Sequence, residues 1–298
     1  PQFRSSNMKD ESMTPNSINS RHASTSLPFL CQLPKKDYWS TPFAESLLSK
    51  LDFSTGTTIL DVTCGSGLPT FYLANSVGST GRVIGLDINE SQLIRARTFQ
   101  GPHFPWLKFR HGDVRDPPSD LKPFDRITGN LSLMFFRPDR KLALRQLIKF
   151  LKPGGQIVLT FPSLGTFESL WQRVDQEMAD QGLKKEQDLF TQYREERPSA
   201  SDAEEWLKEI GLVNVEVEEF PLEIQTDSGQ AFLSHPLLRG GFLDDIYECF
   251  TDQEAAECFM NIIANDIQSF RPLVAQRCVM SGWRSAISIP THTKKPND

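Results

Sequence analysis

The stretch Thr57–Gly67, TTILDVTCGSG, decides the fold of this chain. Its first half is apolar and ends in the carboxylate Asp61, as expected for a buried strand of a sheet. Its second half is a turn of small residues, and a helix is expected to begin after it at Leu68-Pro69. Glycines let the backbone of such a turn approach a ligand closely, and the helix N-terminus points unpaired N–H groups at that ligand. The stretch therefore predicts a ligand site between a strand and a helix.

A second apolar run, Arg82–Asp87 (RVIGLD), follows that helix and also ends in a carboxylate. In open α/β sheets ligands bind beyond the carboxyl ends of the strands, where Asp87 stands at the position expected to hold two ribose hydroxyls. The dinucleotide fingerprint G-x-G-x-x-G would place glycine or alanine where this chain has Thr70. A pyrophosphate would have no use for Asp61. The pattern favours a nucleoside with an ammonium or sulfonium group and no phosphate.

The run Asp61–Gly67, DVTCGSG, resembles the D/E-x-G-x-G-x-G signature of class I S-adenosylmethionine-dependent methyltransferases, with Thr63 in place of the first glycine. The turn Leu151–Gly155 (LKPGG) before an apolar strand is similar to a second hallmark of that family. Taken alone, the first motif also fits an ordinary strand–helix turn of another α/β protein. The strand ends matched in order make the resemblance specific. It implies S-adenosyl-L-methionine as cofactor and S-adenosyl-L-homocysteine as product.

The same resemblance implies which residues hold the cofactor. Asp113 would accept a hydrogen bond from the adenine amine, or, in the alternative interpretation, cap the next turn. The backbone of Val114 would meet the adenine ring, and Asn130 would begin the loop at the methionine end. The implied cofactor-binding set is Asp61, Thr63, Cys64, Gly65, Gly67, Asp87, Ile88, Asp113, Val114, Asn130 and Leu131.

The alternation of apolar segments along the chain predicts an α/β fold. By resemblance it is a seven-stranded, mostly parallel, doubly wound (Rossmann-like) sheet with an antiparallel final strand and helical lid insertions. The expected strands are 58–62, 83–86, 106–110, 124–128, 156–161, 212–224 and 277–284. The expected organisation is a disordered tail (1–34), a cofactor-binding core (35–162), a helical insertion (163–200), a core helix and strand (201–224), a helical lid insertion (225–276), and a last core strand with a tail (277–298).

The lid insertion carries an apolar stripe at helical spacing that includes Phe259, Ile263 and Phe270. Such a stripe usually belongs to a protein core. Because both faces of the sheet are expected to be covered already, the stripe is interpreted here either as a lid over the site or as the surface of a homodimer.

Aromatic residues supply the candidates for the acceptor side of the site, namely Tyr38, Trp39, Phe135, Tyr193 and His235. Tyr38 and Trp39 precede the first helix and are expected at the rim of the site, with a hydrophobic staple as the alternative. The aromatic lid and Leu131–Phe136 (LSLMFF) favour an acceptor with apolar bulk, such as an acyl, polyketide, terpenoid or quinone-like molecule. A sulfonium is a good leaving group, so direct displacement of its methyl group relies largely on positioning. No catalytic acid or base is assigned.

Composition narrows the functional classes. A formal net charge of −6 over 298 residues argues against nucleic acid as a partner. Five cysteines without a C-x-x-C pair favour a reducing compartment over a disulfide framework, and scattered histidines give no metal site. Neither a secretory signal nor an apolar run of membrane-spanning length is present, so the expected location is cytoplasmic. Two alternatives stay open: a protein or RNA methyltransferase on the same core, and a non-catalytic cofactor-binding protein.

Overall fold

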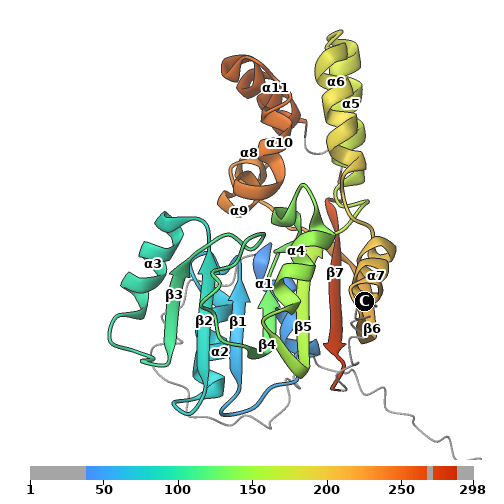
Figure 1. Ribbon diagram of the computed structural model, residues 1–298. Helices are drawn as coiled ribbons and strands as arrows, with labels where there is room; N and C mark the ends of the chain where they lie inside the picture. Colours follow the sequence, from blue (N-terminus) through green and yellow to red (C-terminus); the bar gives the residue numbers. More distant parts are fainter. Residues whose placement is uncertain (1–37, 267–270, 287–298) are drawn as a thin grey trace, which may run out of the picture.

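The computed structural model of this chain describes residues 38–266 and 271–286. They form one seven-stranded sheet with the order β3-β2-β1-β4-β5-β7-β6 (Figure 1). Neighbouring strands from β3 to β5 are parallel, and β7 is antiparallel to both β5 and β6. The strands are β1 (Thr58–Val62), β2 (Arg82–Asp87), β3 (Leu107–His111), β4 (Phe124–Gly129), β5 (Leu151–Pro162), β6 (Leu212–Glu223) and β7 (Val274–Arg284). The predicted fold class is confirmed, while the predicted tail 1–34 lies outside the described residues.

Two strands, β5 and β7, begin three or more residues earlier than expected, and pairing explains both differences. β5 begins at Leu151 because that residue pairs with Phe124 of β4, and the register then shifts before Arg126 meets Gln156. The LKPGG turn is therefore an irregularity within the strand, with Gly154 at a φ of 74°. β7 begins at Val274 because β6 runs beside it over its whole length.

Helices cover both faces of the sheet because successive strand residues point to opposite sides. Ile59 of β1 packs in a buried cluster with side chains of α1 (Ser40–Lys50), α2 (Leu68–Val77) and α3 (Glu90–Gln100). Its neighbour Leu60 packs in a second cluster with α4 (Arg140–Ile148) and α7 (Ala200–Glu209). The doubly wound arrangement thus follows from the alternation of apolar residues along β1.

The two insertions stand above the edge at which the parallel strands end (Figure 1). The first consists of α5 (Glu168–Asp180) and α6 (Lys184–Glu195). The second, named the lid here, consists of α8 (Gly229–Leu233), α9 (Pro236–Leu238), the π-helical turn η4 (Arg239–Leu243), α10 (Asp244–Tyr247) and α11 (Gln253–Asn265). Phe259 and Ile263 of the predicted stripe are buried in one apolar cluster with side chains of α5 and α6. Phe270 lies outside the described residues.

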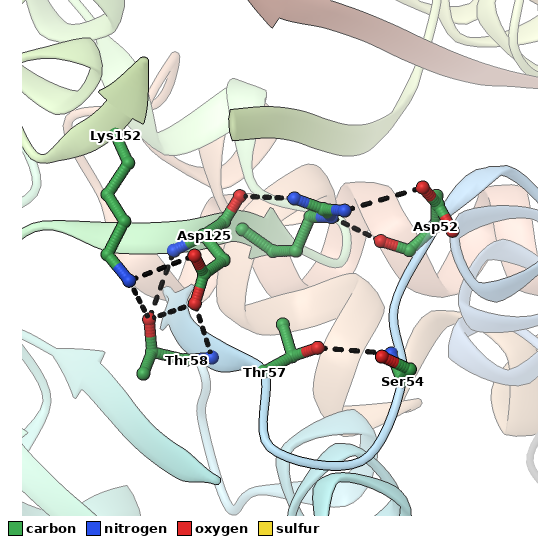
Figure 2. Close-up of polar contacts among 7 residues, drawn as sticks. Asp52, Ser54, Thr57, Thr58, Asp125 and Lys152 are labelled. Carbon is green, nitrogen blue, oxygen red and sulfur yellow. Dashed lines mark hydrogen bonds and ion pairs between the residues drawn. The ribbon is translucent and has the colours of Figure 1, made fainter. Parts of the chain in front are cut away.

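The opposite edge of the sheet is held by a polar network around Asp125 (Figure 2). Its carboxylate accepts hydrogen bonds from the Thr58 N–H (2.9 Å), the Thr58 hydroxyl (2.6 Å) and the Lys152 ammonium (2.9 Å). Beside it, the Arg126 guanidinium donates to the main-chain and side-chain oxygens of Asp52. Burial alone would raise the pKa of Asp125, but the hydrogen bonds from Thr58 and Lys152 outweigh it and lower that pKa to about 2. The network ties the start of β1 to β4 and β5.

We expect Asp125→Asn to lower the free energy of unfolding at neutral pH by about 1–2 kcal/mol, because an amide accepts fewer of these hydrogen bonds and loses the ion pair. The lowered pKa makes the carboxylate stabilising above its ordinary pKa of 3.8, and this stabilisation is lost as the pH falls through about 2. Urea unfolding of both proteins at neutral pH and in steps below pH ~4 measures the difference. Asp120→Asn, which removes an exposed ion pair with Arg110, is the control with little expected effect. A gap between wild type and Asp125→Asn that widens on acidification would contradict this account.

Candidate functional site

The carboxyl ends of β1, β2 and β3 lie side by side, because Val62 pairs with Leu86 and Asp87 pairs with His111. Asp113 follows two residues after β3. The strand order reverses between β1 and β4, and a crevice at such a point is where open α/β sheets bind ligands. Asp61, Asp87 and Asp113 therefore lie at the ends of three adjacent strands, as the sequence predicts.

Asp87 holds the glycine turn against the end of β2. Its two carboxylate oxygens accept hydrogen bonds from the main-chain N–H groups of Gly65 (2.7 Å) and Asn89 (2.8 Å). The Cys64 N–H donates to the carbonyl of Leu86, which fixes the turn a second time. An ionised carboxylate offers about four acceptor positions, so about two stay available to a ligand. This structural role of Asp87 could not be predicted from the motif.

The backbone of the turn shows why small residues occur there. Thr63, at the position of the family's first glycine, has a φ of 50°, a left-handed conformation that glycine adopts most easily. A Cβ on Gly65 would meet nothing within 4 Å, whereas a Cβ on Gly67 would lie 2.9 Å from Phe109 and 3.0 Å from Phe71. Gly65 thus borders open space and Gly67 a packed interior.

Asp61 is buried, with only 1% of its surface exposed. Its carboxylate accepts hydrogen bonds from the hydroxyls of Thr70 (2.5 Å) and Thr128 (2.8 Å). Burial raises the pKa of Asp61 to about 6, although both hydroxyls act in the opposite direction. Thr70 is the residue that departs from the dinucleotide fingerprint, and its contact with Asp61 gives that departure a physical reason. Sequence reasoning missed both threonines as part of the site; only Thr70 had a signal, the break in the glycine pattern.

Asp113 is engaged by Arg115, a residue that the sequence analysis did not select. The carboxylate accepts hydrogen bonds from the Arg115 main-chain N–H (2.8 Å) and from its guanidinium (2.6–3.0 Å). These bonds lower the pKa of Asp113. The main-chain bond is the turn cap of the alternative interpretation. The D-x-R spacing was a signal that could have indicated the pair.

The two apolar residues of the predicted cofactor-binding set differ in exposure. Ile88, which directly follows β2, has 56% of its surface exposed, whereas Val114 is buried.

Asn130 and Leu131, after β4, are linked to β5 through Thr160. The Thr160 hydroxyl donates to the Asn130 side-chain oxygen (2.8 Å) and accepts from the Leu131 N–H (2.9 Å). The Asn130 amide donates to the main-chain carbonyl of Ser40 in α1 (3.2 Å). Thr160 was not predicted, because its part in this loop depends on the pairing of β4 with β5.

The acceptor-side candidates fall in different places. The rings of Tyr38 and His235 lie 4.6 Å apart, so the segment before α1 meets the lid. Trp39 is fully buried against Phe43 and Phe167. The expected position at the rim of the site is therefore wrong for Trp39, and its contacts agree with the alternative of apolar packing at the start of the helix.

The other two candidates belong to separate surroundings. Phe135 is 46% exposed in the 3-10 turn η3 (Leu133–Phe136). Tyr193 of α6 lies under the guanidinium of Arg197, and burial raises its pKa well above the usual range. The structure therefore brings Tyr38 and His235 into contact, while Phe135 lies in the loop after β4 and Tyr193 lies on the first insertion.

Within residues 38–266 and 271–286, histidine, cysteine, aspartate and glutamate side chains form no group of three that could hold a metal ion. No described helix is both long and apolar enough to span a bilayer.

Residues 59–155 match the family described as "Methyltransferase domain". A demethylmenaquinone methyltransferase of Lactococcus lactis is 32% identical over 191 residues, which cover 61% of this chain and 73% of the relative. One from Staphylococcus aureus (strain JH9) is 29% identical over 174 residues, covering 55% and 71%.

Among solved structures, the YcgJ protein of Bacillus subtilis aligns with a TM-score of 0.54 at 16% identity and covers 82% of this chain and 98% of its own, a likeness of fold. The sheet order with antiparallel β7, the domain match and the curated relatives agree with one another. This chain belongs to the class I S-adenosylmethionine-dependent methyltransferases.

Proposed function

We propose that this methyltransferase transfers the methyl group of S-adenosylmethionine to a small, partly apolar molecule by direct displacement. The observation that carries the proposal is the pair of hydrogen bonds from Gly65 and Asn89 to Asp87 at the carboxyl end of β2, next to the reversal of strand order between β1 and β4. It leaves a carboxylate with spare acceptor positions beside an open glycine turn.

The residues of the crevice fit the parts of this cofactor. Asp87 would accept hydrogen bonds from the ribose hydroxyls, and the exposed side chain of Ile88 with Val114 would cover the adenine. The open space beside Gly65 admits a ligand against the backbone. Asn130, held by Thr160, would face the methionine end. When bound, the cofactor supplies an electrophilic methyl group on a sulfonium.

The protein's own contribution to the reaction is positioning. Aligning two reactants in a near-attack geometry can supply roughly 7–11 kcal/mol of a barrier. The two insertions share a buried apolar cluster above the carboxyl edge of the sheet, and in this proposal they cover an acceptor with apolar bulk. The relatives named demethylmenaquinone methyltransferase support a quinone-like acceptor as one such molecule. In this proposal the core at 35–162 holds the cofactor, the segments 201–224 and 277–298 complete the fold, and the insertions at 163–200 and 225–276 cover the acceptor.

Cofactor affinity should depend on pH through Asp61. A pKa of about 6 means that the carboxylate is ionised at neutral pH and protonated in mild acid. Because the sulfonium of the cofactor is a cation that an ionised Asp61 would attract, we expect the affinity for the cofactor to fall about tenfold between pH 7 and pH 5. Calorimetry across this range measures the change. Asp61→Asn should bind more weakly at pH 7 and show a flat profile; an equally steep profile in this variant would remove Asp61 from the explanation.

The function is tested in two steps. Calorimetry of the full chain should detect binding of S-adenosylmethionine and of S-adenosylhomocysteine. Formation of S-adenosylhomocysteine is then measured with a panel of quinone-like, aromatic and acyl acceptors. Turnover of a small apolar acceptor supports the proposal. Methylation of added protein or RNA alone would overturn the acceptor class, and cofactor binding without turnover of any acceptor would favour a non-catalytic role.

A further inference from the structure

A small cavity at the carboxyl edge of the sheet is lined by three arginines, Arg137, Arg140 and Arg197, together with Tyr193 and Asp245. These residues come from the end of η3, from α4, from the end of α6 and from α10 of the lid. Three guanidinium groups around one small cavity are costly unless each has a compensating partner, because their charges repel one another. An arginine that lacks such a partner within the protein is therefore a candidate to bind an anionic ligand.

Two of the three arginines have partners within the protein. The Arg137 guanidinium donates to both carboxylate oxygens of Asp245 (2.9 and 3.0 Å). The Arg197 guanidinium lies over the rings of Trp171 (5.2 Å) and Tyr193 (4.6 Å) and donates to the Tyr193 hydroxyl. Both groups are held in place by these contacts.

Arg140 differs from them. It forms no ion pair with any residue that the structure describes, whereas Arg137 pairs with Asp245 and Glu196. The Nε atom of Arg140 is also buried without a hydrogen-bond partner. Burial and the neighbouring charge of Arg137 lower the pKa of Arg140, and the charges of Glu196, Asp202 and Asp245, which act in the opposite direction, do not offset them. The carboxylates that line the cavity are Glu196 and Asp245, so positive groups exceed negative ones. An unpaired guanidinium is a donor fork that matches a carboxylate or phosphate group.

The cavity lies on the side of the sheet from which the methyl acceptor is expected to approach. Pro162, the last residue of β5, and Met134, four residues after Asn130, line the same cavity. It therefore lies over β4 and β5, on the other side of the strand-order reversal from Asp87 and Asp113. In the proposed function the nucleoside occupies the ends of β2 and β3, so an acceptor must approach from the side of β4 and β5.

We propose that the methyl acceptor carries a carboxylate or phosphate group, and that this group binds in the arginine-lined cavity and pairs with Arg140. The proposal rests on the proposed function. The apolar surfaces of Met134 and Pro162 would then contact the body of the acceptor beside its anionic group.

The test uses calorimetry of the full chain with three probes: inorganic phosphate, phenyl phosphate and benzoate. We expect phenyl phosphate or benzoate to bind at least about tenfold more tightly than inorganic phosphate, because the ring adds apolar contact. Arg140→Gln should weaken that binding about tenfold or more, since it removes the unpaired charge. Arg145→Gln, on the exposed side of the same helix, is the matched control and should leave binding unchanged.

Thermal unfolding tests whether Arg140 has a merely structural role. Without added anion, Arg140→Gln should unfold at the same or a higher temperature than wild type, because it removes a desolvated charge. A large loss of stability would overturn the proposal, as would equal affinity for inorganic and phenyl phosphate, or no binding of any probe. Titration with S-adenosylmethionine in the same samples separates the two proposals. If the protein binds the cofactor but none of the anions, the anion site alone is contradicted. If the wild-type protein does not bind the cofactor, the proposed function is contradicted.

Discussion

Replacement of Asp87 by alanine is expected to weaken S-adenosylmethionine binding by about 2–3 kcal/mol, or roughly 30- to 150-fold. The carboxylate is assigned to the ribose hydroxyls, and it also fixes the glycine turn through Gly65 and Asn89. Its removal therefore leaves buried donors of both the ligand and the backbone without an acceptor. Calorimetry with S-adenosylmethionine and with S-adenosylhomocysteine measures the loss, which should be similar for the two because both carry the ribose.

Two further variants separate the roles of Asp87. Asp87→Asn keeps one carbonyl acceptor and should give an intermediate loss. Glu90→Ala removes an exposed carboxylate paired with Arg97 just after Asp87 and should leave the affinity unchanged. If folded Asp87→Ala bound the cofactor as tightly as wild type, the crevice would have been assigned to the wrong ligand.

The two glycines of the turn should respond differently to alanine. Gly67→Ala is expected to lower the free energy of unfolding by about 2–4 kcal/mol, because the new Cβ would press on Phe71 and Phe109 and the residue has a φ of 89°. Gly65→Ala should cost about 1 kcal/mol of stability, since its Cβ meets nothing within 4 Å. Its main effect should be on S-adenosylmethionine affinity, because the Cβ enters the space assigned to the ligand. Urea unfolding and calorimetry measure the two effects.

Gly182→Ala supplies the matched control for these glycines. Gly182 has a φ of 68°, nothing lies within 4 Å of its Cβ position, and it stands in the turn between α5 and α6. This variant measures the cost of the left-handed backbone alone. Should Gly67→Ala prove no more destabilising than Gly182→Ala, packing against the two phenylalanines would not be the reason for glycine at 67.

Local patterns were sufficient for most of the sheet. The strand ends at Asp61 and Asp87 were predicted to within a residue, because apolar alternation and the turns that interrupt it depend on neighbours in sequence. The starts of β5 and β7 were misplaced because pairing with a distant strand determines them. The position of Trp39 was open for the same reason, since its burial depends on Phe167 of the first insertion.

By itself the sequence determined the succession of strands and helices along the chain, the glycine turn, and the three carboxylates at successive strand ends. These features follow from periodicity and backbone conformation, which act over a few residues. Only the tertiary structure decided what each carboxylate contacts: Asp61 meets Thr128 of β4, and Asp87 meets the backbone of Gly65. It alone gathered Arg137, Arg140 and Arg197 around one cavity. Hydrogen bonds and charge interactions act through space, and the fold brings together groups that the chain keeps far apart.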